Sequence, residues 1–133
     1  MTIVIEVISS EKQRYPTAGD WNWTFDPEHA VGKHRLDQLT IKVSDLGDYK
    51  YNLLVAIHEL VEAILCHRDG ISQELVDEWD KQHPSMEEPG DHPSAPYHKQ
   101  HNKAMAIERM ACELLDLDWQ AYEARLEEML IPF

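Results

Sequence analysis

Apolar and polar positions follow two different periods along this chain, and the change of period divides it into two parts. In the first third, three short segments are β-branched or alternate between apolar and polar residues, as strands with one buried face do. They cover residues 3–8, 21–25 and 39–43. Residues 9–20 contain Pro16 and Gly19 and predict a loop, whereas residues 26–38 favour no single element.

From residue 49 onward the pattern is that of helices. Residues 49–67 are apolar on nearly every side, which is typical of a buried helix, and Gly70 predicts its C-terminal cap. Ser72 is a suitable N-cap for a short helix that ends before Pro84. Residues 83–96 hold four prolines and predict a long loop without regular structure. Two further helices are predicted over residues 97–115 and 119–130.

This order of segments predicts the fold class. Strands come first and helices follow, so we expect an α+β fold with a small N-terminal β-sheet of about three strands and a helical second half. The length of 133 residues suits one domain with one core, and no repeat or linker divides residues 1–133.

The predicted buried helix carries the chain's most informative cluster, His58-Glu59-Leu60-Val61-Glu62. Residues four apart on a helix project side by side, so His58 and Glu62 can hold one divalent ion between them. Glu59 points about 100° away from His58, where it can reach a water on the metal without being a ligand. Ionisable residues are rarely buried unless they are paired or bound to metal. A metal site is therefore predicted, and a buried His–carboxylate network is the alternative.

A second histidine cluster opens the helix at residues 97–115. His98 and His101 share a face, and Glu108 lies two turns beyond His101 on nearly the same stripe. If this helix packs on the buried one, His101 completes a site with His58 and Glu62, and His98 is a fourth ligand or a hydrogen-bonding partner of a ligand. Asp91, in the preceding loop, is a candidate hydrogen-bonding partner for a ligand histidine.

Charge and composition limit the classes of molecule that this protein is expected to bind. Twenty-five acidic residues against 12 basic ones give a net charge of −13, which disfavours binding to nucleic acid or to an anionic membrane surface. The N-terminal segment lacks the basic residues of a signal peptide, and no apolar run approaches membrane-spanning length. Cys66 and Cys112 lie in apolar helical surroundings and predict buried free thiols. We therefore expect a cytoplasmic protein.

The segment at 53–66 resembles the active-site helix of zincin-type metallopeptidases, which carries His-Glu-x-x-His under a small sheet. This chain keeps His58 and Glu59 but has Glu62 at the second ligand position. The resemblance implies a metal-dependent hydrolase of a peptide or protein substrate, with Glu59 as general base. Zinc is the expected metal, and the carboxylate at 62 brings in manganese, iron or nickel as alternatives.

Two other resemblances lead to different functions. Residues 50–110 resemble a family of small phage and prophage proteins without an assigned activity, which implies an interaction protein with a structural metal or a His–Glu network. The acidic residues also resemble the magnesium site of all-α nucleotide pyrophosphatases, with Glu59 and Glu62 on one helix and Glu108 and Glu113 on the next. The N-terminal strands and the histidines argue against that second family, because magnesium prefers oxygen ligands.

Overall fold

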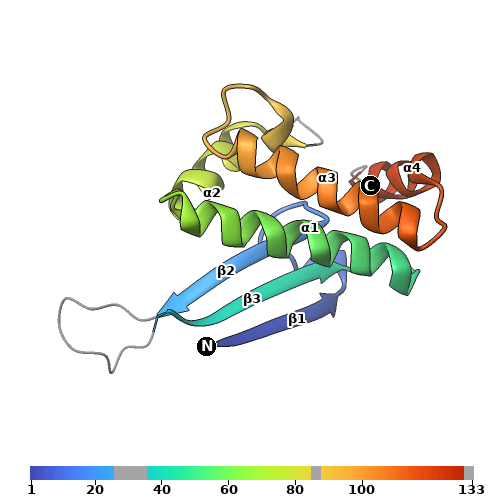
Figure 1. Ribbon diagram of the computed structural model, residues 1–133, viewed down its shortest axis with the longest axis horizontal. Coiled ribbons are helices and arrows are strands. Elements are labelled where there is room, and N and C mark those ends of the chain that lie inside the picture. The colour runs from blue at the N-terminus through green and yellow to red at the C-terminus, as the bar shows by residue number, and fades with distance from the viewer. Residues whose placement is uncertain (26–35, 85–87, 131–133) are drawn as a thin grey trace.

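A three-stranded sheet precedes a set of helices, as the computed structural model shows for residues 1–25, 36–84 and 88–130 (Figure 1). This confirms the α+β fold class with its small N-terminal sheet. The described elements run in the following order: β1 (Thr2–Ile8), η1 (Ser10–Lys12), β2 (Gly19–Phe25), β3 (Leu36–Ser44), α1 (Tyr49–Arg68), α2 (Gln73–Gln82), η2 (Pro89–Asp91), α3 (His98–Leu114) and α4 (Trp119–Leu130). Residues 26–35, which belong to the segment left unassigned from sequence, lie outside the described residues.

The middle strand of the sheet is the last one in sequence. β3 pairs with β1 in parallel and with β2 in antiparallel orientation, so the strand order is β1-β3-β2. The two-residue period of β3 points Leu39, Ile41 and Val43 to one face, where all three are fully buried. Their partners on β1 remain about half exposed, at 46% for Ile3 and 49% for Ile5. The core therefore lies over β3 and β2, and β1 forms an open edge.

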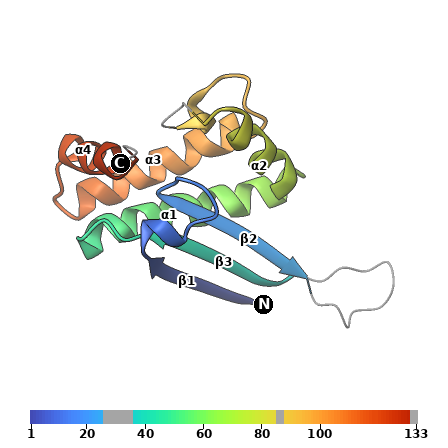
Figure 2. The same ribbon diagram turned by 180° about the vertical axis from the view of Figure 1, so that it is seen from behind.

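Helix α1 lies between the sheet and α3 (Figures 1 and 2). This position explains why its sequence is apolar on nearly every side, because one side packs on β2 and β3 and another on α3. The Asp48 side chain caps its N-terminus by accepting from the Lys50 backbone N–H. At its C-terminus Gly70 has φ +73°, and the Ile71 N–H bonds to the Cys66 carbonyl, so the predicted glycine cap is confirmed.

The two shorter helices lie at opposite ends of the α1–α3 pair (Figures 1 and 2). α2 follows α1 directly, with Ser72 as its N-cap, and α4 follows α3. The predicted helix and strand bounds differ from the observed ones by three residues at most. The proline-rich stretch 83–96, for which no regular structure was expected, does contain the 3-10 turn η2.

The two cysteines, Cys66 and Cys112, are buried and free, as predicted. Both belong to the layer in which α1 and α3 meet, Cys66 on α1 and Cys112 on α3. Among the described residues, no helix has the length and apolar character needed to cross a membrane.

Candidate metal centre

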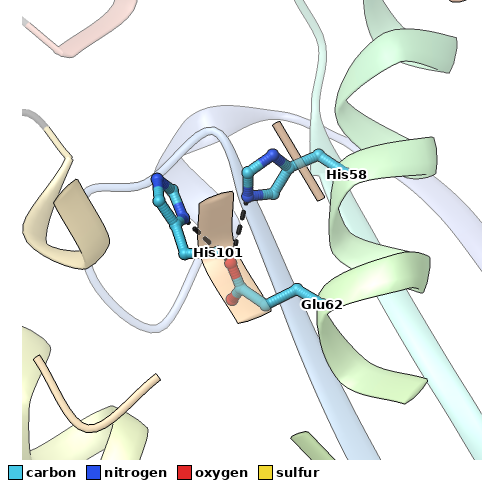
Figure 3. Close-up of side chains that lie close together, drawn as sticks. All are labelled: His58, Glu62 and His101. Atoms are coloured by element: carbon cyan, nitrogen blue, oxygen red, sulfur yellow. Dashed lines mark hydrogen bonds and ion pairs between the residues drawn. The ribbon is translucent and has the colours of Figure 1, made fainter. Parts of the chain in front are cut away.

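Three side chains from two helices converge in the middle of the α1–α3 layer (Figure 3). The Oε2 atom of Glu62 lies 3.0 Å from Nε2 of His58 and 3.0 Å from Nδ1 of His101. All three ligand atoms lie within 4.8 Å of one another, and all three residues are buried. We call His58, Glu62 and His101 the central group.

The spacing of residues on α1 and the packing of α3 create this group. His58 and Glu62 lie one turn apart on α1, so both side chains leave the same side of the helix. α3 packs against that side and brings in His101 from its first turn, with the imidazole rings of His58 and His101 4.8 Å apart. The structure thus brings together three of the four residues expected as metal ligands.

Each histidine of the central group contacts a second carboxylate through its other nitrogen. His58 Nδ1 lies 2.7 Å from Glu108 Oε1, and His101 Nε2 lies 2.9 Å from Asp91 Oδ1. A carboxylate can only accept, and the inward nitrogens face Glu62, so both nitrogens of each ring carry protons in this arrangement; binding of a metal would displace the inward ones. Such carboxylate partners fix the ring orientation of metal-binding histidines and increase their basicity.

The remaining oxygen atoms of the two buried glutamates are also satisfied. Trp21 Nε1–H donates to Glu62 Oε1 at 3.1 Å, and the Tyr122 hydroxyl donates to Glu108 Oε2 at 2.6 Å. Five elements (β2, α1, η2, α3 and α4) therefore hold the group and its partners in place. Neither Trp21 nor Tyr122 was a candidate from sequence, since both contacts depend on packing between distant segments.

His98 is not part of the central group. It lies about 60° round α3 from His101, and its Nδ1 contacts the Gly90 carbonyl at 2.9 Å. Gly90 packs so closely on the ring of His101 that an added Cβ would lie 2.6 Å from Cγ. His98 thus helps to fix the turn η2, whose last residue, Asp91, contacts His101. In this arrangement His98 is therefore not positioned as a fourth ligand.

Glu59, the expected general base, is half-buried on the wall of a cavity that the central group also lines. The cavity has a volume of about 540 Å³, within the range of about 300–1,000 Å³ that is usual for small-ligand sites. Glu59 packs against the start of β2, where a Cβ at Gly19 would lie 2.5 Å from its Cγ. The glycine at this position therefore leaves room for the Glu59 side chain.

The contacts within the central group favour a negative charge on Glu62 and positive charges on the two histidines. Burial alone would raise the pKa of Glu62, but its contacts with His101 and His58 outweigh burial and hold the pKa at about 2. Burial alone would lower the pKa of His58, but its contacts with Glu108 and Glu62 raise it well above the usual value. His101 behaves in the same way through Glu62. Glu59 differs, because burial and then the charge of Glu62 both raise its pKa.

The donor set fits a divalent transition metal. Two imidazoles and one carboxylate form a known catalytic zinc set, which leaves a fourth position open. At zinc bond lengths, neighbouring ligand atoms lie roughly 3.3 Å apart in a tetrahedral site, which is close to the 3.0 Å contacts of Glu62. Magnesium fits less well, because two of the three donors are nitrogens. Glu113, which the pyrophosphatase alternative requires, is exposed and does not line the cavity.

Comparisons with known proteins add no assignment. No protein-family model matches the chain, and no curated protein or solved structure matches it. The geometry of the central group and its cavity is therefore the basis for a function.

Proposed function

We propose that this protein is a metal-dependent hydrolase of peptide or amide bonds, with a divalent ion held by His58, Glu62 and His101. Zinc is the preferred metal, with manganese, iron or nickel as alternatives. The observation that carries this proposal is the pairing of each histidine with a carboxylate through the nitrogen that faces away from the group. The inward nitrogens both face Glu62 Oε2 at 3.0 Å, so three potential ligand atoms lie close together, as metal binding requires.

In this proposal an ion at the central group supplies Lewis-acid activation of water and of the substrate carbonyl. Glu59 lies on the same cavity wall and accepts a proton from the water as the water oxygen bonds to the carbonyl carbon. The Glu59 carboxyl then passes that proton to the leaving nitrogen as the C–N bond breaks. The products are a carboxylic acid and an amine.

Metal content tests the first half of the proposal. Protein purified without chelator should carry about one transition ion per chain by elemental analysis, and His58→Ala with His101→Ala should remove it. The matched control is His83→Ala with His92→Ala, which also deletes two histidines but leaves the central group intact. Circular dichroism checks that both double variants fold. Equal metal content in the two folded variants would refute the ligand assignment.

Catalysis is tested at Glu59. Metal-loaded wild type should cleave peptides in a broad library analysed by mass spectrometry, and Glu59→Gln should keep the metal and lose the cleavage. Glu113→Gln, an exposed change of the same kind on α3, should keep both. An active Glu59→Gln protein would remove the general-base role.

A non-catalytic role is the second candidate function, and one observation favours it. The contacts of Glu62 with His58 and His101 are hydrogen-bonding distances, so the network satisfies its own polar atoms. In this case the group would pin α1 to α3 in an interaction protein, such as the phage family that residues 50–110 resemble. A wild type that is fully metal-loaded, or free of metal, and cleaves no peptide would favour this role.

We also propose that the protein is cytoplasmic. Cys66 and Cys112 are both buried and free, which suits a compartment that keeps thiols reduced.

A further inference from the structure

The cavity beside the central group differs in chemistry between its two ends. Its lining includes residues of α2 and residues of α4, and these helices lie at opposite ends of the α1–α3 pair (Figures 1 and 2). His58 and Glu62 lie between them, near the middle of α1. A ligand that fills the cavity therefore extends in both directions from the central group.

The end at α2 is acidic. Four carboxylates line it, namely Asp20, Asp77, Asp80 and Glu88. Two cations offset part of this charge. Arg14 binds both Asp20 and Asp77, at 2.8 and 3.1 Å, and Lys81 is the one lysine or arginine in the described lining. Asp80 and Glu88 make no ion pair with a lysine or arginine among the described residues, and Glu88 Oε2 lies 3.9 Å from His101 Nε2.

Asp80 connects this acidic end to the central group. It accepts a 2.5 Å hydrogen bond from the Tyr97 hydroxyl, and the ring of Tyr97 stands edge-on to His101 at 6.1 Å. One tyrosine side chain therefore separates the Asp80 carboxylate from a proposed metal ligand. Burial raises the pKa of the Asp80 carboxyl to about 6, because little water solvates its anion. A cationic group that enters here would stabilise that anion.

The end at α4 is mostly apolar, with the Glu108 carboxylate between it and the central group. Leu126 and Leu130 lie one turn apart on α4 and line the cavity, and the ring of Tyr122 joins them. Val55 lines the cavity from α1, three residues before His58. Apolar side chains bury favourably against such a surface, whereas charged ones would lose their hydration there.

We infer that the cavity binds an extended peptide segment with a basic side chain at the α2 end and an apolar side chain at the α4 end, across the central group. This inference rests on the proposed function for the metal and for the class of substrate. The size of the cavity suits a few residues of peptide rather than a whole protein. The acidic side chains at the α2 end also disfavour phosphorylated or acidic side chains there, since like charges repel.

Isothermal titration calorimetry with zinc-loaded protein at pH 7.5 tests the inference. The probes are capped pentapeptides with one lysine and one leucine separated by a single residue, made in both orders. In one partner peptide glutamate replaces lysine, and in another serine replaces leucine. One order of the lysine–leucine peptide should bind at least about tenfold more tightly than its glutamate partner and about fivefold more tightly than its serine partner.

Variants at the two ends assign the selectivity to the cavity. Asp77→Asn with Asp80→Asn should reduce the lysine-over-glutamate preference to about threefold or less. The matched control, Glu74→Gln with Glu78→Gln, changes the charge of the same helix equally but at exposed positions outside this cavity, and should keep the preference. Leu130→Ser should remove the preference for leucine over serine.

Two outcomes overturn the inference: equal binding of the lysine and glutamate peptides, or no binding of any peptide. Binding is measured separately from cleavage, so the two proposals can fail independently. Selective binding without cleavage keeps this inference and refutes the hydrolase. Cleavage of peptides without a preference for lysine over glutamate would keep the hydrolase proposal and refute this inference.

Discussion

Tyr122→Phe removes one buried hydroxyl from the chain of contacts that ends at His58. In the wild type this hydroxyl donates to Glu108 Oε2 at 2.6 Å, and Glu108 Oε1 contacts His58 Nδ1. Tyr122 is fully buried, and its ring packs against the rings of Tyr51 and Trp119. Phenylalanine keeps this ring packing, so the substitution isolates the hydrogen bond.

The size of the effect follows from the charge and burial of Glu108, which is only 6% exposed. A hydrogen bond to a charged group contributes about 1.5–3 kcal/mol, and water cannot easily replace the donor at a buried site. We expect a loss of about 2 kcal/mol in the free energy of unfolding. With a urea m-value of about 2 kcal/mol per M, the unfolding midpoint should fall by about 1 M.

Urea denaturation followed by circular dichroism measures this shift, with metal removed from both proteins. Tyr51→Phe is the matched control, because Tyr51 packs against the same ring but is only partly buried. Its free energy of unfolding should stay within about 0.5 kcal/mol of wild type. If Tyr122→Phe and Tyr51→Phe unfold at the same urea concentration, the hydroxyl does not support Glu108 and the reasoning fails.

Three further perturbations address the surroundings of the central group. Glu108→Gln should weaken zinc binding by about 10–100-fold in competition with a chromogenic chelator, whereas exposed Glu113→Gln should not; equal losses would contradict the role of Glu108. Burial raises the pKa of Asp80 to about 6, so the folded state holds its proton more tightly than the unfolded chain does. The free energy of unfolding should therefore fall by about 1–2 kcal/mol as the pH rises from 4 to 6, after allowance for partial exposure. Asp80→Asn should remove this component of the urea-measured pH dependence, and identical pH profiles for the two proteins would count against it. Gly90→Ala would place a methyl group 2.6 Å from the ring of His101 and should destabilise the fold by about 1–3 kcal/mol in thermal denaturation. An unchanged melting temperature would show that the contact relaxes freely.

The local period of the sequence was sufficient to predict most of the fold. Strand and helix positions followed from spacing alone, and so did the pairing of His58 with Glu62, since residues four apart on a helix share a side. Placing His101 beside them required one assumption, that the second histidine-bearing helix packs on the first. The α1–α3 contact confirms that assumption.

Contacts between distant segments could not be predicted. Trp21 donates to Glu62 across 41 positions of sequence, and nothing in its strand marks it for that contact. His98 shares its helical turn with His101 but is directed to a backbone carbonyl in η2 instead. The period of a helix fixes relative angles within it, whereas the partner of each side chain depends on how the helices and loops pack.

The strand order also determines when the sheet can form. Within the described sheet β1 pairs with β3 alone, so Thr2 must find Gln38, and β1 can pair only after β3 has been synthesised. Long-range parallel pairing of this kind is slow, since a long loop must close before any contact forms. During synthesis, β1, with its apolar residues Ile3, Ile5 and Val7, thus has no β3 partner until more than 30 further residues have been added. Addition of β1 is therefore the step of sheet formation with the longest sequence separation, since the partners in the β2–β3 pair lie closer together in the chain.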